Sequence, residues 1–153
     1  MPDRVSVNTA FVGRAFPAAE SYQVGREKVR EFARAVGEKA AVCHDVAAAR
    51  AAGHPDVVAP PTFAAAFTMP LIEQVLRDPE FGWDYAHMVH GDQSITLQRP
   101  ICGGDELSVT VHVEDLSTRA GSHRLTLRSE IADAAGSPVA TTRLLLVTAA
   151  EAS

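Results

Sequence analysis

Apolar residues follow a helical spacing in the first part of the chain and a strand spacing in the second. Between residues 25 and 36 they recur three and four positions apart, which predicts an amphipathic helix. These residues are Val29, Phe32, Ala33 and Val36. Gly37 follows where a glycine commonly ends a helix. From residue 87 onward apolar and polar residues alternate, which predicts strands. The predicted strands cover residues 87–98, 107–113, 122–132 and 139–148, with turns at 99–105 and 134–137.

One long apolar stretch stands between these two parts. Residues 57–59 have the composition of a strand and are followed by Pro60 and Pro61. The run that follows contains no charged residue before Glu73. The run predicts a helix over about 62–77, bent or split by Pro70. A helix that is apolar nearly all round has to be covered on all sides. The pattern therefore predicts one long buried helix wrapped by a curled antiparallel sheet, an α+β architecture.

Shorter elements complete the predicted order. Residues 21–24 form a short strand, and residues 11–14 form a short edge segment. Asp45 is placed to cap a short helix over 46–52, and Gly53 follows where that helix ends. The order is therefore strand, helix, short helix, long helix, and four antiparallel strands.

Two details of the predicted strands concern which side chains point inward. Val89, Ile95 and Leu97 are the inward candidates on the strand over 87–98. In the strand over 122–132 the alternation breaks between Leu127 and Ile131.

Composition narrows the class of protein. A chain of 153 residues fits one domain over residues 1–153, with its core over about 10–148. A net charge of −5 argues against binding nucleic acid, which favours basic surfaces. The chain has no apolar run long enough for a membrane span, and its start lacks the pattern of a signal peptide. Two cysteines without a CxxC motif fit a reduced, cytoplasmic protein. The six histidines are scattered, so we expect no metal site.

Three segments resemble the MaoC-like dehydratases. They are Tyr22–Ala33, Ala47–Phe63 and the "RP…GD.L" element at Arg99–Leu107. The chain is most similar to the non-catalytic-subunit type of the actinobacterial (3R)-hydroxyacyl-ACP dehydratases, the FAS1-like or MaoC N-terminal type. The resemblance covers about residues 10–148. It implies a single hotdog fold, in which an antiparallel sheet wraps one long helix.

The resemblance also implies a chemistry. Active members carry a Gly-Asp-x-Asn-Pro-x-His loop after the first helix. Dehydration of a 3-hydroxyacyl thioester needs a base for the C2 proton and an acid for the departing hydroxyl. It also needs N–H donors for the thioester oxygen. In these enzymes the Asp and His share the proton transfers, and a glycine N–H at the start of the buried helix polarises the carbonyl.

This chain departs from that pattern in the loop and at the helix start. Glu38 falls where the family has Asp, and Cys43 falls where it has His. His44 comes one residue late, which in an extended loop points it to the other side. At the helix start the family's His-Gly is replaced by Pro60-Pro61, and proline has no N–H to donate.

These departures predict a substrate-binding, catalytically degenerate subunit of a (3R)-hydroxyacyl thioester dehydratase or hydratase in fatty-acid or related lipid metabolism. We expect the substrate, an acyl-ACP or acyl-CoA, at Pro61, Thr62, Phe63, Phe67 and His90. We expect the partner, a second MaoC-like hotdog subunit, to supply the Asp/His pair, and we expect no metal or redox cofactor.

Other interpretations stay open. A self-sufficient homodimeric enoyl thioester hydratase would use Glu38 and His44 as catalytic residues in a rebuilt loop. A non-catalytic acyl-thioester or lipid-binding protein would use neither. The same residues also fit purely structural roles, with Glu38 as a solvated loop acid and Phe63 and Phe67 as core. Four cations of the first helix, Arg26, Lys28, Arg30 and Arg34, form either a solvated face or a contact for an acidic carrier protein or a coenzyme A phosphate.

Overall fold

The computed structural model describes residues 6–150. Its helices are α1 (Arg26–Ala35), α2 (Val46–Ala51) and α3 (Ala64–Leu76). Short 3-10 helices lie at Thr9–Phe11, Ala41–Cys43, Pro61–Phe63 and Tyr85–His87. The strands are β1 (Ala15–Pro17), β2 (Tyr22–Gln23), β3 (Val89–Leu97), β4 (Glu106–Arg119), β5 (Ser122–Ala132) and β6 (Pro138–Ala149). The predicted order of elements is confirmed, with β1 as an addition.

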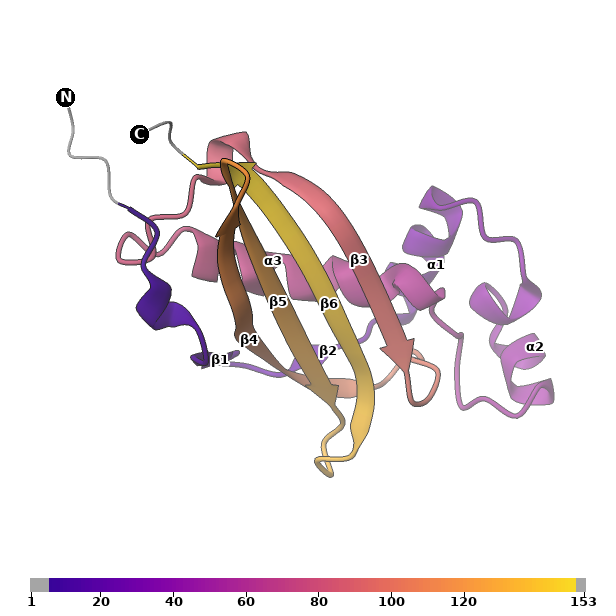
Figure 1. Ribbon diagram of the computed structural model, residues 1–153. Helices are drawn as coiled ribbons and strands as arrows, with labels where there is room; N and C mark the ends of the chain where they lie inside the picture. Colours follow the sequence, from indigo (N-terminus) through magenta and orange to yellow (C-terminus); the bar gives the residue numbers. More distant parts are fainter. Residues whose placement is uncertain (1–5, 151–153) are drawn as a thin grey trace.

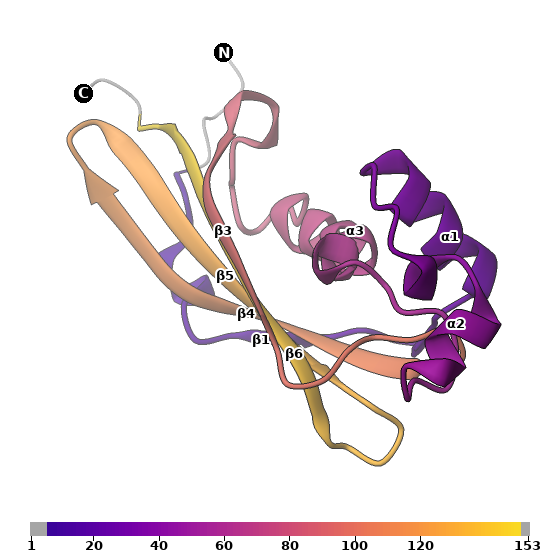
Figure 2. The same cartoon turned by 90° about the vertical axis from the view of Figure 1, so that its right-hand side faces the viewer.

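All strand pairs of the sheet are antiparallel, in the order β1-β4-β5-β6-β3, and β2 also pairs with β4. The long strand β4 therefore carries both short N-terminal strands, while β3 forms the opposite edge. Figure 1 shows α3 running across the sheet, and Figure 2 shows α3 and the lobe of α1 and α2 on the same side of it. The helix start thus lies between the lobe and the sheet.

The predicted alternation on β4 is confirmed, because its four inward apolar residues are all buried: Leu107, Val109, Val111 and Val113. On β5 the predicted break is wrong. Ser129 continues the alternation at a fully buried inward position between Leu127 and Ile131. The sequence pattern broke only because a polar residue occupies an inward place.

Two predictions near strand edges are wrong for identifiable reasons. Val89 is 61 % exposed, because a bulge between His90 and Asp92 inserts Gly91 and reverses the alternation before it. His90 therefore pairs with inward Leu146, whereas Ile95 and Leu97 are partly buried as predicted. Residues 11–14 form no strand, because Phe11 ends a 3-10 helix capped by the Asn8 side chain.

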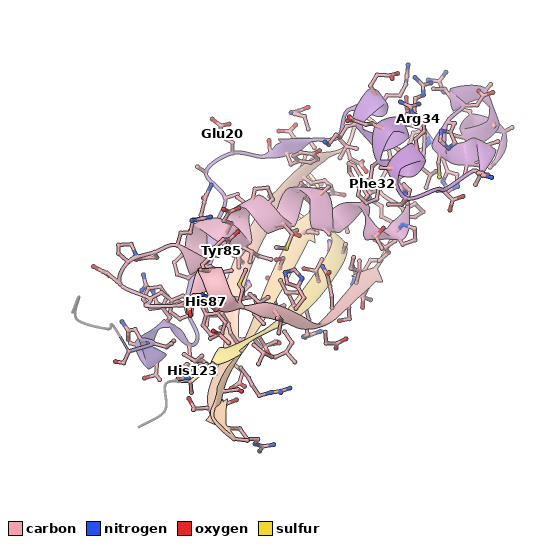
Figure 3. The ribbon with its side chains drawn as sticks, turned by 90° about the horizontal axis from the view of Figure 1, so that it is seen from above. Glu20, Phe32, Arg34, Tyr85, His87 and His123 are labelled. Atoms are coloured by element: carbon pink, nitrogen blue, oxygen red, sulfur yellow. The ribbon has the colours of Figure 1, made fainter. Side chains whose placement is uncertain are left out.

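The long helix differs from its prediction in two respects. Pro70 neither splits nor ends α3, which continues through it to Leu76. The helix is also covered on one face only: its sheet-facing residues are buried, whereas Pro70 and Gln74 are exposed. In Figure 3 the exposed face is flanked by the N-terminal segment (residues 14–22, which includes the labelled Glu20) on one side and β3 on the other.

Candidate functional site

The loop after α1 closes on itself. Gly37 ends α1 with a φ of 76°, and the Glu38 carboxylate accepts a hydrogen bond from the Ala40 N–H at 2.8 Å. The chain then makes a 3-10 turn over Ala41–Cys43, so the extended loop expected before His44 is wrong. This turn brings His44 Nε2 to 2.7 Å from the Glu38 carbonyl oxygen. A carbonyl only accepts, so Nε2 carries the proton and donates it.

Helix α1 holds this loop through its cations. Arg30 Nε donates to the His44 carbonyl oxygen at 2.8 Å, and Arg30 also pairs with Glu27. Arg26 makes a two-pronged contact with Asp56, with Nε–Oδ1 and Nη2–Oδ2 distances of 2.9 and 2.6 Å. Two of the four cations of the predicted basic face are therefore engaged in ion pairs within the chain.

Asp56 is the most strongly perturbed carboxylate that the structure describes. Its hydrogen bond with Arg26, helped by one from the Val57 N–H, lowers its pKa from 3.8 to about 2. Gly103 makes this close packing possible, because a Cβ at that position would lie 2.7 Å from Asp56 Oδ1. Asp56 is therefore a fixed charge that joins α1 to the turn before β4.

The "RP…GD.L" element is a scaffold for the same region. Arg99 and Asp105 form a two-pronged ion pair with distances of 2.8 and 3.1 Å, and Asp105 also accepts from the Cys102 N–H. Cys102 forms a β-bridge with Val58, and the Val58 N–H donates to the Val42 carbonyl at 2.8 Å. These contacts tie the 38–44 loop to the turn through the strand-like residues before the helix start.

At the helix start, Pro60 is buried while Pro61 and Thr62 are exposed. Pro61 is the first residue of the 3-10 turn that leads into α3. Because proline has no N–H, this position presents no hydrogen-bond donor. The place where the resemblance puts an oxyanion donor is thus exposed but lacks the donor.

Two cavities lie on opposite flanks of α3. The first, of about 310 Å³, lies between the helix start and β3; it is lined by Pro61, Thr62, Ala65, Gln93 and Ile95. The second, of about 290 Å³, lies on the flank of the N-terminal segment; its lining includes Tyr22, Ala66, Phe67, Pro70 and Leu71. We call them the β3 cavity and the Tyr22 cavity.

The predicted site residues are divided between these places. Pro61 and Thr62 line the β3 cavity, Phe67 lines the Tyr22 cavity, and Phe63 is fully buried. His90 is exposed on β3, and neither it nor Glu38 or His44 lines either cavity.

Sequence reasoning missed most of the residues that line the two cavities, among them Gln93, Ile95 and Tyr22. The alternation through Ile95 and Leu97 puts Gln93 on the same face, but a polar residue there gave no apolar signal to follow.

Two features of residues 6–150 bear on metal binding and thiol chemistry. No group of three or more His, Cys, Asp or Glu side chains in this part of the chain is arranged to hold a metal ion. Cys43 and Cys102 are buried, and burial raises the pKa of both thiols. Both sulfurs are therefore poor nucleophiles at neutral pH.

None of the helices in residues 6–150 is long and apolar enough to cross a membrane.

Comparisons with known proteins agree with the fold. The family model described as "FAS1-like, dehydratase domain region" matches residues 10–142. A UPF0336 protein of Saccharopolyspora erythraea is 45% identical over 141 residues, which cover 92% of this chain and 90% of the relative.

Two solved structures are similar throughout most of the chain. A MaoC-like dehydratase superposes with a TM-score of 0.86 at 34% identity over 92% of this chain; the match spans only 42% of that longer chain. A chain from the Mycobacterium tuberculosis HadBC complex, a (3R)-hydroxyacyl-ACP dehydratase, has a TM-score of 0.83 at 26% identity, with 90% and 96% coverage. The predicted hotdog fold and MaoC-like resemblance are confirmed.

Proposed function

The chain belongs to the FAS1-like dehydratase domain family, and from this premise we propose that it is a substrate-binding, catalytically degenerate subunit. The enzyme would be a heteromeric (3R)-hydroxyacyl thioester dehydratase or hydratase. The observation that carries the proposal is the closed loop: the Glu38 carboxylate and His44 Nε2 both bond to the loop's own backbone. Pro61 adds a second deficit, because it offers no N–H to a thioester oxygen.

The reaction explains why these deficits matter. Dehydration moves the C2 proton to a base, while the C3 hydroxyl leaves as water after an acid protonates it, and a C2–C3 double bond forms. Each positioned proton-transfer group contributes on the order of 10²–10⁴-fold to the rate. Loss of an oxyanion donor costs about 10²–10³-fold more. A chain that lacks both would need a partner with an intact Asp/His loop and glycine N–H.

The exposed edge of the sheet supports a partner at β3. Residues 89–94 are all exposed, and the structure pairs β3 only with β6 within the described chain. An edge strand left open in this way is a template for another strand. The β3 cavity opens beside it, so a second hotdog subunit at this edge would cover Gln93 and the exposed helix start. That a chain of the HadBC complex shares this fold agrees with such a pairing.

The β3 cavity also supports a role in holding substrate. Thr62 and Gln93 offer polar groups at its rim, and Ile95 and Ala65 offer apolar surface. A thioester has the matching character, with a polar carbonyl next to an apolar chain. We place the acyl chain of a 3-hydroxyacyl thioester here, bound against the helix start and entering from the partner's side.

The test is hydration of a trans-2-enoyl-CoA, followed by the loss of enoyl-thioester absorbance. We expect no turnover by the purified chain. We expect turnover when the chain is co-purified with a MaoC-like subunit from the same genome that carries the Gly-Asp-x-Asn-Pro-x-His loop. His44→Ala and Glu38→Gln should each change the activity of this complex by less than about tenfold, well below the cost of losing a general acid or base.

Turnover by the chain alone, abolished by His44→Ala, would overturn the proposal and favour a homodimeric hydratase. Acyl binding without turnover, with any partner, would instead favour a lipid-binding protein. A matched pair of variants tests the location. Gln93→Trp fills the β3 cavity and should lower kcat/KM of the complex by about 100-fold, whereas Ser94→Trp lies on the outer face opposite Arg143 and should not.

A further inference from the structure

Pro70 leaves a gap in the hydrogen bonding of α3. It lies inside the helix and has no N–H, so the Ala66 carbonyl one turn earlier lacks its usual helix donor. The proline ring also crowds this carbonyl and displaces it from the helix axis. Within the described residues no backbone N–H from outside the helix donates to it, and the Thr68 hydroxyl donates to the Ala64 carbonyl instead. The Ala66 carbonyl is therefore an acceptor available to a donor from outside the chain.

This carbonyl belongs to the wall of the Tyr22 cavity. Ala66 and Pro70 both line that cavity, which holds about 290 Å³, and Pro70 is exposed. Water can satisfy an exposed carbonyl, and a ligand that replaces the water has to bring a donor of its own. Much of the remaining wall is apolar, with Leu71 and Val109 among its residues. A ligand that fits this cavity thus combines an apolar body with an N–H or O–H group.

The charge at the cavity favours a cation. Glu20 is exposed and is the only charged residue among those that line the cavity. Burial raises the pKa of the Tyr22 phenol, so this ring stays uncharged at neutral pH. The field of a single carboxylate attracts cations and repels carboxylates and phosphates. The cavity is therefore unsuited to the anionic groups of a fatty acid or of coenzyme A.

Two aromatic rings strengthen this preference. Tyr22 stacks on Phe67 with 4.6 Å between centroids and an interplanar angle of 13°, and both residues line the cavity. Aromatic rings attract an ammonium group that comes within about 6 Å. An ammonium N–H also makes a stronger, charge-assisted hydrogen bond to a carbonyl oxygen than a neutral donor does.

We propose that the Tyr22 cavity binds a small organic ammonium ion, namely a protonated primary amine with an apolar body. The ammonium group donates to the Ala66 carbonyl, and the apolar body lies against Leu71 and Val109. Glu20 is exposed, so it acts through its field at the mouth of the cavity.

The position of the cavity separates this site from the dehydratase reaction. The cavity lies between α3 and the N-terminal segment, on the flank of the helix away from β3 (Figure 3). A subunit docked at the β3 edge would leave it open. Its outer wall is fixed by the fold, because the Ala18 N–H donates to the Val109 carbonyl at 2.9 Å and Tyr22 pairs with Leu107 of β4. The site is thus formed before any ligand arrives.

The experiment is an NMR titration of the full chain with n-hexylamine, an amine that is protonated at neutral pH. 1-Hexanol and hexanoate, which have the same alkyl length, are the comparison probes. We expect hexylammonium to shift the Tyr22 and Leu71 amide signals, 1-hexanol to bind there more weakly, and hexanoate not to bind there. If 1-hexanol bound as tightly as hexylammonium, the proposal would be overturned.

Pro70→Ala is the decisive variant. It supplies the missing N–H to the Ala66 carbonyl, and its smaller side chain leaves the cavity unfilled. The Kd of hexylammonium should rise by about 10–100-fold, the range for a hydrogen bond to a charged group. Pro79→Ala is the matched control, since it removes an exposed proline outside both cavities and should keep the wild-type Kd. A Pro70→Ala chain with the wild-type Kd would overturn the proposal.

Further variants locate the site and keep the proposal testable if Pro70→Ala fails to fold. Ala66→Leu fills the Tyr22 cavity and should abolish binding of both hexylammonium and 1-hexanol, whereas Gln93→Trp in the β3 cavity should leave both Kd values unchanged. Glu20→Gln should weaken hexylammonium by up to about fivefold and leave 1-hexanol unaffected. Binding that is lost in Gln93→Trp but kept in Ala66→Leu would place the amine in the β3 cavity and contradict the proposal.

Discussion

The two ends of the core are held by different kinds of interaction. At the end near the helix start, the Arg26–Asp56 and Arg99–Asp105 ion pairs and the Arg30–His44 contact fix loops and turns. At the other end, Phe81 stacks on Phe11 at 4.5 Å and packs beside Trp83 at 6.2 Å, and the ion pairs nearby, Arg77–Glu73 and His87–Asp84, join exposed side chains. We call these the polar end and the aromatic end.

This difference indicates what each end does. Apolar packing is non-directional and stabilises a fold without fixing one loop shape. Charge-assisted hydrogen bonds with two contact points fix geometry as well as energy. The polar end therefore keeps the loop over residues 38–44 in a defined shape, and the Glu38 and His44 side chains bond to that loop's own backbone. Such a loop is suited to shaping a binding surface, which agrees with the proposed subunit role.

Among the variants considered, Phe81→Ala, at the aromatic end, should have the largest effect on the free energy of unfolding. Phe81 is fully buried, and a large-to-small change in such a core costs about 3–5 kcal/mol of unfolding free energy. Urea unfolding followed by circular dichroism measures the loss, and Val12→Ala, at a 41 % exposed site, is the control with almost none. If the aromatic end stabilises the fold without shaping the candidate site, the folded Phe81→Ala complex keeps the wild-type kcat/KM.

Gly103→Ala, at the polar end, should have the next largest effect on the free energy of unfolding. Its Cβ would lie 2.7 Å from Asp56 Oδ1, so Asp56 has to move away from Arg26 at a cost of about 2 kcal/mol. In an Asp56→Ala background the same change should cost under about 1 kcal/mol, because the overlapping atom is gone. Equal costs in both backgrounds would show that Gly103 acts on something other than Asp56.

Asp56→Asn should have a smaller effect that depends on pH. The pKa of Asp56 is lowered from 3.8 to about 2, so its ion pair stabilises the fold fully above pH 4 and progressively less as pH falls toward 2. Because Arg26 is 46 % exposed, we expect a contribution of about 1–2 kcal/mol after solvent screening. The unfolding free energies of wild type and variant should differ at pH 6 and converge near pH 2. A difference that stays constant with pH would contradict an ionic contribution.

Ser129→Ala should have the smallest effect, with the opposite sign. Ser129 lies where the two ends of the core meet, and its buried Oγ has no hydrogen-bond partner in the described chain. Removing it should leave stability unchanged or raise it by up to about 1 kcal/mol. Thr68→Ala is the matched control, since Thr68 Oγ1 donates to the Ala64 carbonyl at 2.9 Å and its loss should destabilise. A Ser129→Ala protein less stable than wild type would mean that the hydroxyl does have a partner.

Local signals predicted most of the fold and little of the candidate site. The alternation on β4 and the caps at Asp45 and Gly37 are confirmed, because periodicity and capping depend on neighbours in sequence. The predicted inward orientation of Val89 was wrong, because one inserted residue, Gly91, exchanges the inward and outward positions of the strand before it. Alternation alone does not reveal where a bulge lies.

The loop over residues 38–44 shows the same limit at the candidate site. Its residue types predicted that the family's acid–base pair is missing, whereas its shape did not follow from them. A 3-10 turn placed His44 against the Glu38 carbonyl, and Arg30 of α1 holds the His44 backbone. Tyr22 and Gln93 carried no signal of their own, since each became a cavity residue only through packing against α3.

The sequence by itself determined which groups are present and how they are spaced: Pro61 has no N–H, and the inward positions of β4 over residues 107–113 are apolar. These hold in any conformation that keeps the strands, because they depend only on residue identity and spacing. Only the tertiary structure decided that Pro61 and Phe67, six positions apart, line cavities on opposite flanks of one helix. That outcome depends on which segments pack on each flank of α3, the open edge of β3 on one side and Tyr22 on the other.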